Sequence, residues 1–207
     1  MRSSYGISQQ RARYSSFARM FVAGVIVAAS GAFISHAATA QEGDDIQQQY
    51  EALAKIGPAH EIFATMEGKW NADITSFMGP GGKTEKSTGT ATFRRIFGGR
   101  YLIEEVNATF GGKAFEGMGT FGFDNSIQKY VTTWIDNMGT GIMRGEATLD
   151  ETTETMTEHL EGNGPGGQTY KMKSIYHRES ENHIRLTMYM LGPDQAETKV
   201  MEIIYKR

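Results

Sequence analysis

The sequence HIRLTMYML occupies residues 183–191, and its pattern decides the fold. Every second side chain is apolar, in the order Ile184, Leu186, Met188 and Met190. Successive side chains of a β-strand point to opposite faces, so this alternation predicts a strand with one buried face. The turn residues Gly192-Pro193-Asp194 follow, and residues 200–205 alternate again. Two such segments joined by a short turn predict an antiparallel hairpin.

The same pattern extends back along the chain to Gly68. Nine clusters of turn residues separate ten segments rich in Thr, Val, Ile, Tyr, Phe and Met. Ten hairpin-connected strands would leave long open edges in a flat sheet, whereas closure removes them. We therefore predict an all-β fold, an antiparallel up-and-down barrel of about ten strands that can enclose a small ligand. Helix formers at residues 45–54 and 58–66 predict a short N-terminal helical segment that caps one end.

The first forty residues differ in character from the rest. They contain four arginines and no acidic residue, followed by an apolar run at residues 20–34 and then Ala38-Thr39-Ala40. This order is typical of a secretory signal peptide, residues 1–40, cleaved before Gln41. We expect a bacterial periplasmic or extracellular protein, with mitochondrial transit as a lesser alternative. The run is shorter than the roughly 20 residues of a membrane span, so no stable span is expected after cleavage.

The remaining chain is long enough for one domain with a core of its own. We expect a helical or linker segment at residues 41–57 and a single β-barrel domain at residues 58–207. Residues 41–207 contain 17 basic and 24 acidic side chains, a formal charge of −7, and no basic run, so nucleic acid is not an expected partner. The chain has no cysteine, which excludes disulfides and thiolate metal sites.

The stretch EGMGTFGFD at residues 116–124 contains the G-x-G-x-x-G spacing of dinucleotide-binding folds. Such a site needs a helix directly after the glycines to hold the phosphates, and here a turn and another strand pattern follow. Gly117 and Gly119 would share one face of a strand, with Gly122 on the other. We therefore predict a structural role, in which these glycines let the barrel wall curve or leave room beside a cavity.

Several motifs, in order, resemble bacterial domain-of-unknown-function family 1579. They are RIFGGRYL (95–102), FEGMG (115–119), GFDN (122–125), WID (134–136), MGTG (138–141) and MEIIYKR (201–207). The resemblance covers roughly residues 58–207 and implies a calycin-like β-barrel with no established activity. Gly68-Lys69-Trp70 also resembles the G-x-W of the first lipocalin strand, where the tryptophan closes the barrel floor beside a late basic residue. Lys206 or Arg207 would be that residue here.

The histidines indicate neither a metal nor a haem site. Outside the predicted signal peptide they are His60, His159, His177 and His183. No two have the spacing that would bring them together on one strand or helix face, so we expect each to face water. The related nitrobindins bind haem through a histidine late in the barrel, and residues 199–207 contain none. We therefore predict no cofactor and no metal.

Doubled charges in two adjacent predicted strands indicate a polar group inside the barrel. Arg94 and Arg95 stand in one strand, and Glu104 and Glu105 in the next. Because side chains alternate, one arginine and one glutamate must point inward, although the sequence does not say which. A buried charge is costly unless it is paired, so we predict an internal Arg–Glu pair. Such a pair is either a structural ion pair at the barrel end or an anchor for a ligand head group.

Further candidates lie on the faces that these strands would share. Trp134 and Asp136 alternate onto one face with Tyr130 and could join the pair. Methionines suit an adaptable apolar cavity and serve equally as core filler. The complete set of candidate ligand-binding residues is Arg94, Arg95, Arg100, Glu104, Glu105, Tyr130, Trp134, Asp136, Met188, Met201 and Tyr205.

Three functions remain open at this point. The leading hypothesis is an exported barrel that binds a small, mostly apolar molecule in its interior. An enzyme that uses cavity carboxylates for acid–base chemistry is the second. A structural or partner-binding cell-envelope protein is the third, and it would have a fully packed barrel. The identity of the ligand and the oligomeric state do not follow from the sequence.

Overall fold

The computed structural model of the protein describes residues 37–78 and 83–207, with side chains from residue 45 onward. The predicted signal peptide therefore lies almost entirely outside the described residues. Residues 46–207 form one compact unit. None of the helices in the described part is long and apolar enough to cross a membrane.

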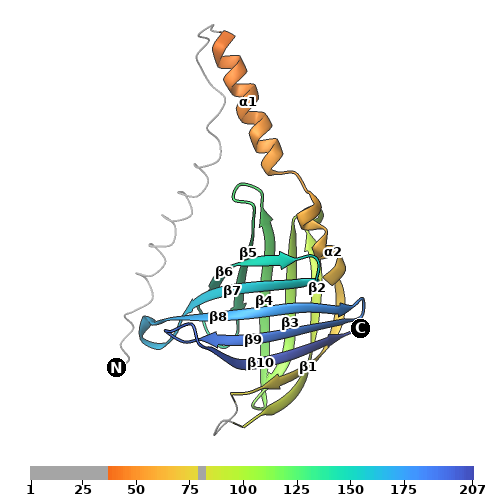
Figure 1. Cartoon of the computed structure of the whole chain (residues 1–207), viewed down its shortest axis with the longest axis vertical. Coiled ribbons are helices and arrows are strands. Elements are labelled where there is room, and N and C mark those ends of the chain that lie inside the picture. Colours follow the sequence, from red (N-terminus) through yellow and green to blue (C-terminus); the bar gives the residue numbers. More distant parts are fainter. Residues whose placement is uncertain (1–36, 79–82) are drawn as a thin grey trace, which may run out of the picture. The chain divides into compact units, whose positions relative to one another are not determined.

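Ten antiparallel strands close into an up-and-down barrel, as predicted (Figure 1). Each strand pairs with its neighbours in sequence, and β1 pairs with β10 to close the ring. The strands are β1 (Gly68–Ser76), β2 (Glu85–Ile96), β3 (Tyr101–Phe110), β4 (Lys113–Asp124), β5 (Lys129–Asp136), β6 (Met143–Asp150), β7 (Thr155–Asn163), β8 (Thr169–Ser180), β9 (His183–Leu191) and β10 (Glu197–Lys206). Closure leaves no unpaired sheet edge, which explains how so many consecutive hairpins form one stable sheet.

Short helices precede and interrupt the barrel. They are α1 (Ala37–Leu53), η1 (Pro58–His60), α2 (Ile62–Met66), η3 (Phe97–Gly99) and η4 (Pro165–Gly167). The predicted helix at residues 45–54 falls largely within α1. The predicted helix at residues 58–66 is divided into η1 and α2.

His60 corrects the expectation that every histidine faces water, since only 4% of it is exposed. Its Nδ1 atom accepts a 3.1 Å hydrogen bond from the backbone N–H of Gly57, which closes the turn at η1. The ring packs edge-on against Phe63 and Phe123. His60 is therefore part of the core at the end of the barrel where η1 and α2 lie.

The barrel floor beside α2 is closed in the way the lipocalin-like motif predicts. Trp70 is 2% exposed, and its indole N–H donates a 2.9 Å hydrogen bond to the Met66 carbonyl. The Arg207 guanidinium lies 4.3 Å from the centre of the Trp70 ring and donates to the Glu67 carbonyl. Arg207 is therefore the late basic residue of the floor, whereas Lys206 pairs with Asp73 on the outer wall.

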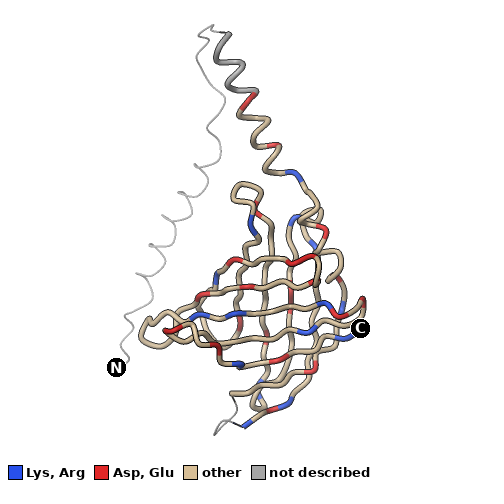
Figure 2. The backbone as a smooth tube through the Cα atoms, in the orientation of Figure 1, with Lys and Arg blue, Asp and Glu red and all other residues tan. Residues whose placement is uncertain are grey.

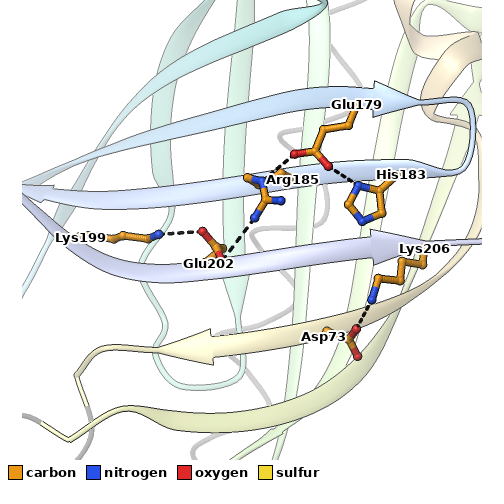
Figure 3. A network of polar contacts seen from close by, with 7 residues as sticks. All are labelled: Asp73, Glu179, His183, Arg185, Lys199, Glu202 and Lys206. Atoms are coloured by element: carbon orange, nitrogen blue, oxygen red, sulfur yellow. Dashed lines mark hydrogen bonds and ion pairs between the residues drawn. The ribbon is translucent and has the colours of Figure 1, made fainter.

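Charged residues of both signs are interspersed along the strands (Figure 2). On β8, β9 and β10, Glu179 contacts His183 and Arg185, and Glu202 contacts Arg185 and Lys199 (Figure 3). All these side chains are partly exposed, and exposed pairs of this kind stabilise a protein only weakly. Alternation along the strands places this network outside the barrel, opposite the apolar interior.

Candidate functional site

A cavity of about 400 Å³ lies inside the barrel. Its wall includes Ser76 at the end of β1 and Glu85 at the start of β2, so it reaches the barrel end opposite to α2. Six of its lining residues are methionines, namely Met78, Met138, Met143, Met172, Met188 and Met201. Three phenylalanines, Phe110, Phe115 and Phe121, also line it, together with aliphatic residues such as Ile74, Leu160 and Ile203. The barrel interior is therefore only partly filled by side chains.

The glycines of β4 make room for Trp134 at the cavity wall. A Cβ atom on Gly117 would overlap the Trp134 indole, and one on Gly119 would lie 3.3 Å from it. The indole stacks on Phe115, and its N–H donates a 2.9 Å hydrogen bond to Asp136. Gly122 faces the Tyr101 ring instead. Gly117 and Gly119 therefore leave room for Trp134 beside the cavity, which is one of the two roles predicted for them.

Glu104 projects from β3 into the interior and is only 1% exposed. The hydroxyl of Tyr205 donates to its Oε1 atom at 2.8 Å, and that of Tyr176 donates to its Oε2 atom at 3.2 Å. Burial above all, together with the charge of Glu158, raises the pKa of Glu104 to about 7, although the hydrogen bonds from the two hydroxyls oppose the rise. A carboxyl with this pKa exchanges a proton near neutrality.

Glu158 on β7 is a second buried carboxyl, 4% exposed, that lines the same cavity. Burial raises its pKa, and the nearby hydroxyls of Thr132 and Ser174 partly offset the rise. Glu158 was not among the residues predicted from the sequence. The signal was present, because Glu158 alternates onto one face with Met156 and Leu160, as Glu104 does with its apolar neighbours.

The predicted internal Arg–Glu pair is wrong. Glu104 is the inward glutamate, but its partners are tyrosine hydroxyls. Glu105 points outward and lies 3.5 Å from Arg94 on the surface. Arg95 lies near the barrel floor and forms a 2.9 Å ion pair with Glu67. Neutral donors satisfy the buried carboxyl because its raised pKa reduces the charge that must be paired.

The eleven candidate ligand-binding residues divide into two groups by their position relative to the cavity. Those that line the cavity are Glu104, Trp134, Asp136, Met188, Met201 and Tyr205. Arg100 and Tyr130 lie at the opposite end, where they donate hydrogen bonds to the carbonyls of Ala54 and Ala59, respectively. With Arg94, Arg95 and Glu105 they fall outside the cavity wall. The structure therefore brings together about half of the predicted set.

The chemistry of the cavity is that of an acidic, otherwise apolar chamber. Four carboxylic side chains line it, Glu85, Glu104, Asp136 and Glu158. Within the described residues, no Lys, Arg or His lines it, and no group of three or more His, Asp or Glu could hold a metal ion. A larger hollow lies on the outer wall, but charged side chains such as Arg144 and Glu161 line it and it is more open to solvent. We therefore place the candidate site inside the barrel.

These features define a calycin-like β-barrel with an internal cavity. Residues 55–207 match the family of proteins of unknown function DUF1579, and the chain belongs to this family. The structure is similar to the crystal structure of Rv2717c from M. tuberculosis, with a TM-score of 0.53 and 13% identity. The similarity covers 74% of this chain and 99% of that one and extends to the fold alone. No curated protein matches the sequence.

Proposed function

We propose that this protein is exported and binds a small, mostly apolar molecule inside its barrel. The observation that carries the proposal is an apolar cavity with two buried carboxyl groups, Glu104 and Glu158, at its wall. Its volume of about 400 Å³ falls within the range of roughly 300 to 1,000 Å³ typical of small-molecule sites. Such sites combine apolar walls with a few polar groups that orient the ligand.

The methionines support a ligand of variable shape. Thioether side chains are flexible and polarisable, so they repack around different apolar surfaces. Met78 and Met138 are largely exposed and line the cavity, and Met172 and Met188 line it between more deeply buried residues. These methionines let part of the wall adapt to related apolar molecules.

Export rests on the pattern of residues 1–40. The test is to express the full chain with a C-terminal tag in a bacterium, and to compare cell fractions by immunoblotting. We expect the cleaved form, beginning at Gln41, outside the inner membrane. A chain that keeps residues 1–40 and stays with the cytoplasmic fraction would remove this part of the proposal.

Ligand binding is tested by native mass spectrometry of protein purified gently from its host. We expect an additional small-molecule mass that organic extraction removes. Trp134 provides a second readout, because it lies at the cavity wall while Trp70 is sealed in the floor. A ligand should change the emission of the wild type and leave that of Trp134→Phe almost unchanged. A native mass equal to that of the protein alone, together with Trp134 emission that ligand does not change, would count against binding.

The raised pKa of Glu104 favours acid–base catalysis as a second candidate function. A carboxyl that titrates near pH 7 in an apolar chamber can remove and return a proton at neutral pH. The test is to return the extracted ligand to the apoprotein in deuterated water. Deuterium incorporation with wild type but not with Glu104→Gln would support an enzyme, and unchanged ligand with both would support a binding protein.

A further inference from the structure

In the described part of the chain, the cavity contains acidic groups without a cationic side chain beside them. Its four carboxylic side chains face no positively charged side chain among the described lining residues. Glu85 and Asp136 lie near the open end, while Glu104 and Glu158 are buried within. A fatty acid or another anionic amphiphile would bring a further negative charge into this chamber. A cation would instead offset the charge that is already there.

Glu158 also has unused hydrogen-bonding capacity. It is 4% exposed and lines the cavity. Burial raises its pKa, and the Thr132 and Ser174 hydroxyls, which lie nearby, lower it. A carboxylate has about four acceptor sites, so two hydroxyls leave some of them free. Thr132 Oγ1 is itself buried without a hydrogen-bond partner within residues 45–78 and 83–207. Buried polar groups without partners are rare in stable proteins, and a bound ligand or water is a common reason for them.

Glu104 and Glu158 are both buried at the wall of the same cavity. Besides burial, the charge of Glu158 raises the pKa of Glu104. Tyr205 and Tyr176 occupy one side of Glu104. A group placed between the carboxyls could donate to Glu158 and offset its charge at the same time. Only a donor that carries a positive charge does both.

We infer that the cavity selects apolar molecules that carry a protonated amine, and that Glu158 and Glu104 receive the ammonium group. The inference rests on the proposed function and specifies its ligand class. An ammonium group has three N–H donors, which match the free acceptor sites of Glu158 and the Thr132 hydroxyl. The apolar part of the molecule would extend past Phe115, Met172 and Met188 toward the open end.

The test compares three ligands with the same tail: octylamine, octanol and octanoic acid, at neutral pH. Affinity is measured by calorimetry, and occupancy of the cavity by Trp134 emission. We expect octylamine to bind about tenfold more tightly than octanol, since a charge-assisted hydrogen bond is roughly that much stronger than a neutral one. Octanoate should bind most weakly.

Glu158→Gln tests the charge of the carboxyl alone, because glutamine has nearly the same shape and can still form hydrogen bonds. We expect its octylamine affinity to fall about tenfold while octanol affinity stays within about twofold. Glu105→Gln is the matched control, since Glu105 points outward with its side chain 47% exposed. It should leave both affinities unchanged. A purely structural role of Glu158 would instead lower the affinities for octylamine and octanol together.

The outcomes separate this inference from the proposed function. Equal binding of octylamine and octanol would overturn the selection of amines and leave the apolar cavity as a binding site. Preferred binding of octanoate would overturn the selection as well. Binding of none of the three would remove both proposals for ligands of this size. Binding of the three ligands to the wild-type protein decides these points, so the test does not depend on whether Glu158→Gln folds.

Discussion

The Tyr205 hydroxyl donates a 2.8 Å hydrogen bond to Oε1 of the buried Glu104, and the two residues lie 101 positions apart in the chain. Tyr176 donates to Oε2 of the same carboxyl from β8. Burial and the Glu104 charge raise the pKa of both tyrosines well above the usual range, so their hydroxyls stay protonated and act as donors. Three strands, β3, β8 and β10, therefore meet at one carboxyl.

Removing one of these donors should destabilise the protein. Tyr205→Phe keeps the ring, which packs edge-on against Phe93, and deletes only the hydroxyl. We expect a loss of about 1 to 3 kcal/mol in the free energy of unfolding, because the buried carboxyl loses a hydrogen bond. Urea denaturation above pH 7 measures it. Tyr101→Phe is the control, since Tyr101 is 41% exposed, and equal losses in the two variants would refute the role of the Glu104 bond.

The raised pKa of Glu104 should make stability fall as pH rises. An unfolded chain releases this proton near pH 4.5, whereas the folded protein keeps it up to about pH 7. The folded state therefore binds more protons in this window, and its stability decreases by about 3 kcal/mol across it. Tyr205, Tyr176 and Glu158 face the carboxyl, and the raised pKa of Glu158 acts in the same direction.

Glu104→Gln should remove the contribution of Glu104 to this pH dependence. Subtracting the stability of the variant from that of the wild type at each pH cancels the surface carboxyls, several of which have lowered pKa values. The stability of the wild type relative to the variant should fall between pH 4.5 and about pH 7 and stay constant at higher pH. Glu105→Gln should give no such slope. A flat difference for Glu104→Gln would show that its pKa is ordinary.

Much of the fold follows from the sequence because its signals are local. Alternation at residues 183–191 and at residues 200–205 depends only on which face of a strand is buried, and short turns require neighbouring strands to pair. The same rule predicts that either Glu104 or Glu105 points inward, and the structure shows that it is Glu104, which shares a face with apolar Leu102 and Val106. The division of the segment at residues 58–66 depends on packing of His60 against Phe123, which a local pattern does not contain.

The candidate site was harder to predict because its contacts cross the barrel. Pairing register determines which residues are neighbours within the wall, but not which side chains meet through the interior. Either Arg94 or Arg95 was the predicted partner of the inward glutamate, but Arg94 lies beside Glu105 on the surface and Arg95 pairs with Glu67 near the floor. Tyr205 fills that role from the last strand. Glu158 could have been found from alternation, because it shares a face with Met156 and Leu160.

A methyl group on Gly117 should disturb the cavity wall. In Gly117→Ala the added Cβ would overlap the Trp134 indole, so the indole or β4 must shift. Overpacking of this kind costs about 1 to 3 kcal/mol. We expect a lower melting temperature together with altered Trp134 emission. Gly141→Ala is the matched control, because no atom lies within 4 Å of its added Cβ. Unchanged emission in Gly117→Ala would contradict the role of this glycine.

The floor should depend on Arg207 far more than on its neighbour Lys206. Arg207→Ala removes the cation from the Trp70 face and the hydrogen bonds to the carbonyls of Glu67 and Glu181. We expect a loss of about 2 kcal/mol in the free energy of unfolding, from a cation–π contact and two charge-assisted hydrogen bonds. Lys206→Ala breaks only an exposed ion pair with Asp73 and should cost less than about 1 kcal/mol. Because Arg207 contacts the ring directly, Arg207→Ala should also change Trp70 emission when measured in Trp134→Phe. Equal destabilisation by the two alanine variants, with Trp70 emission unchanged, would mean that Arg207 does not hold the floor closed.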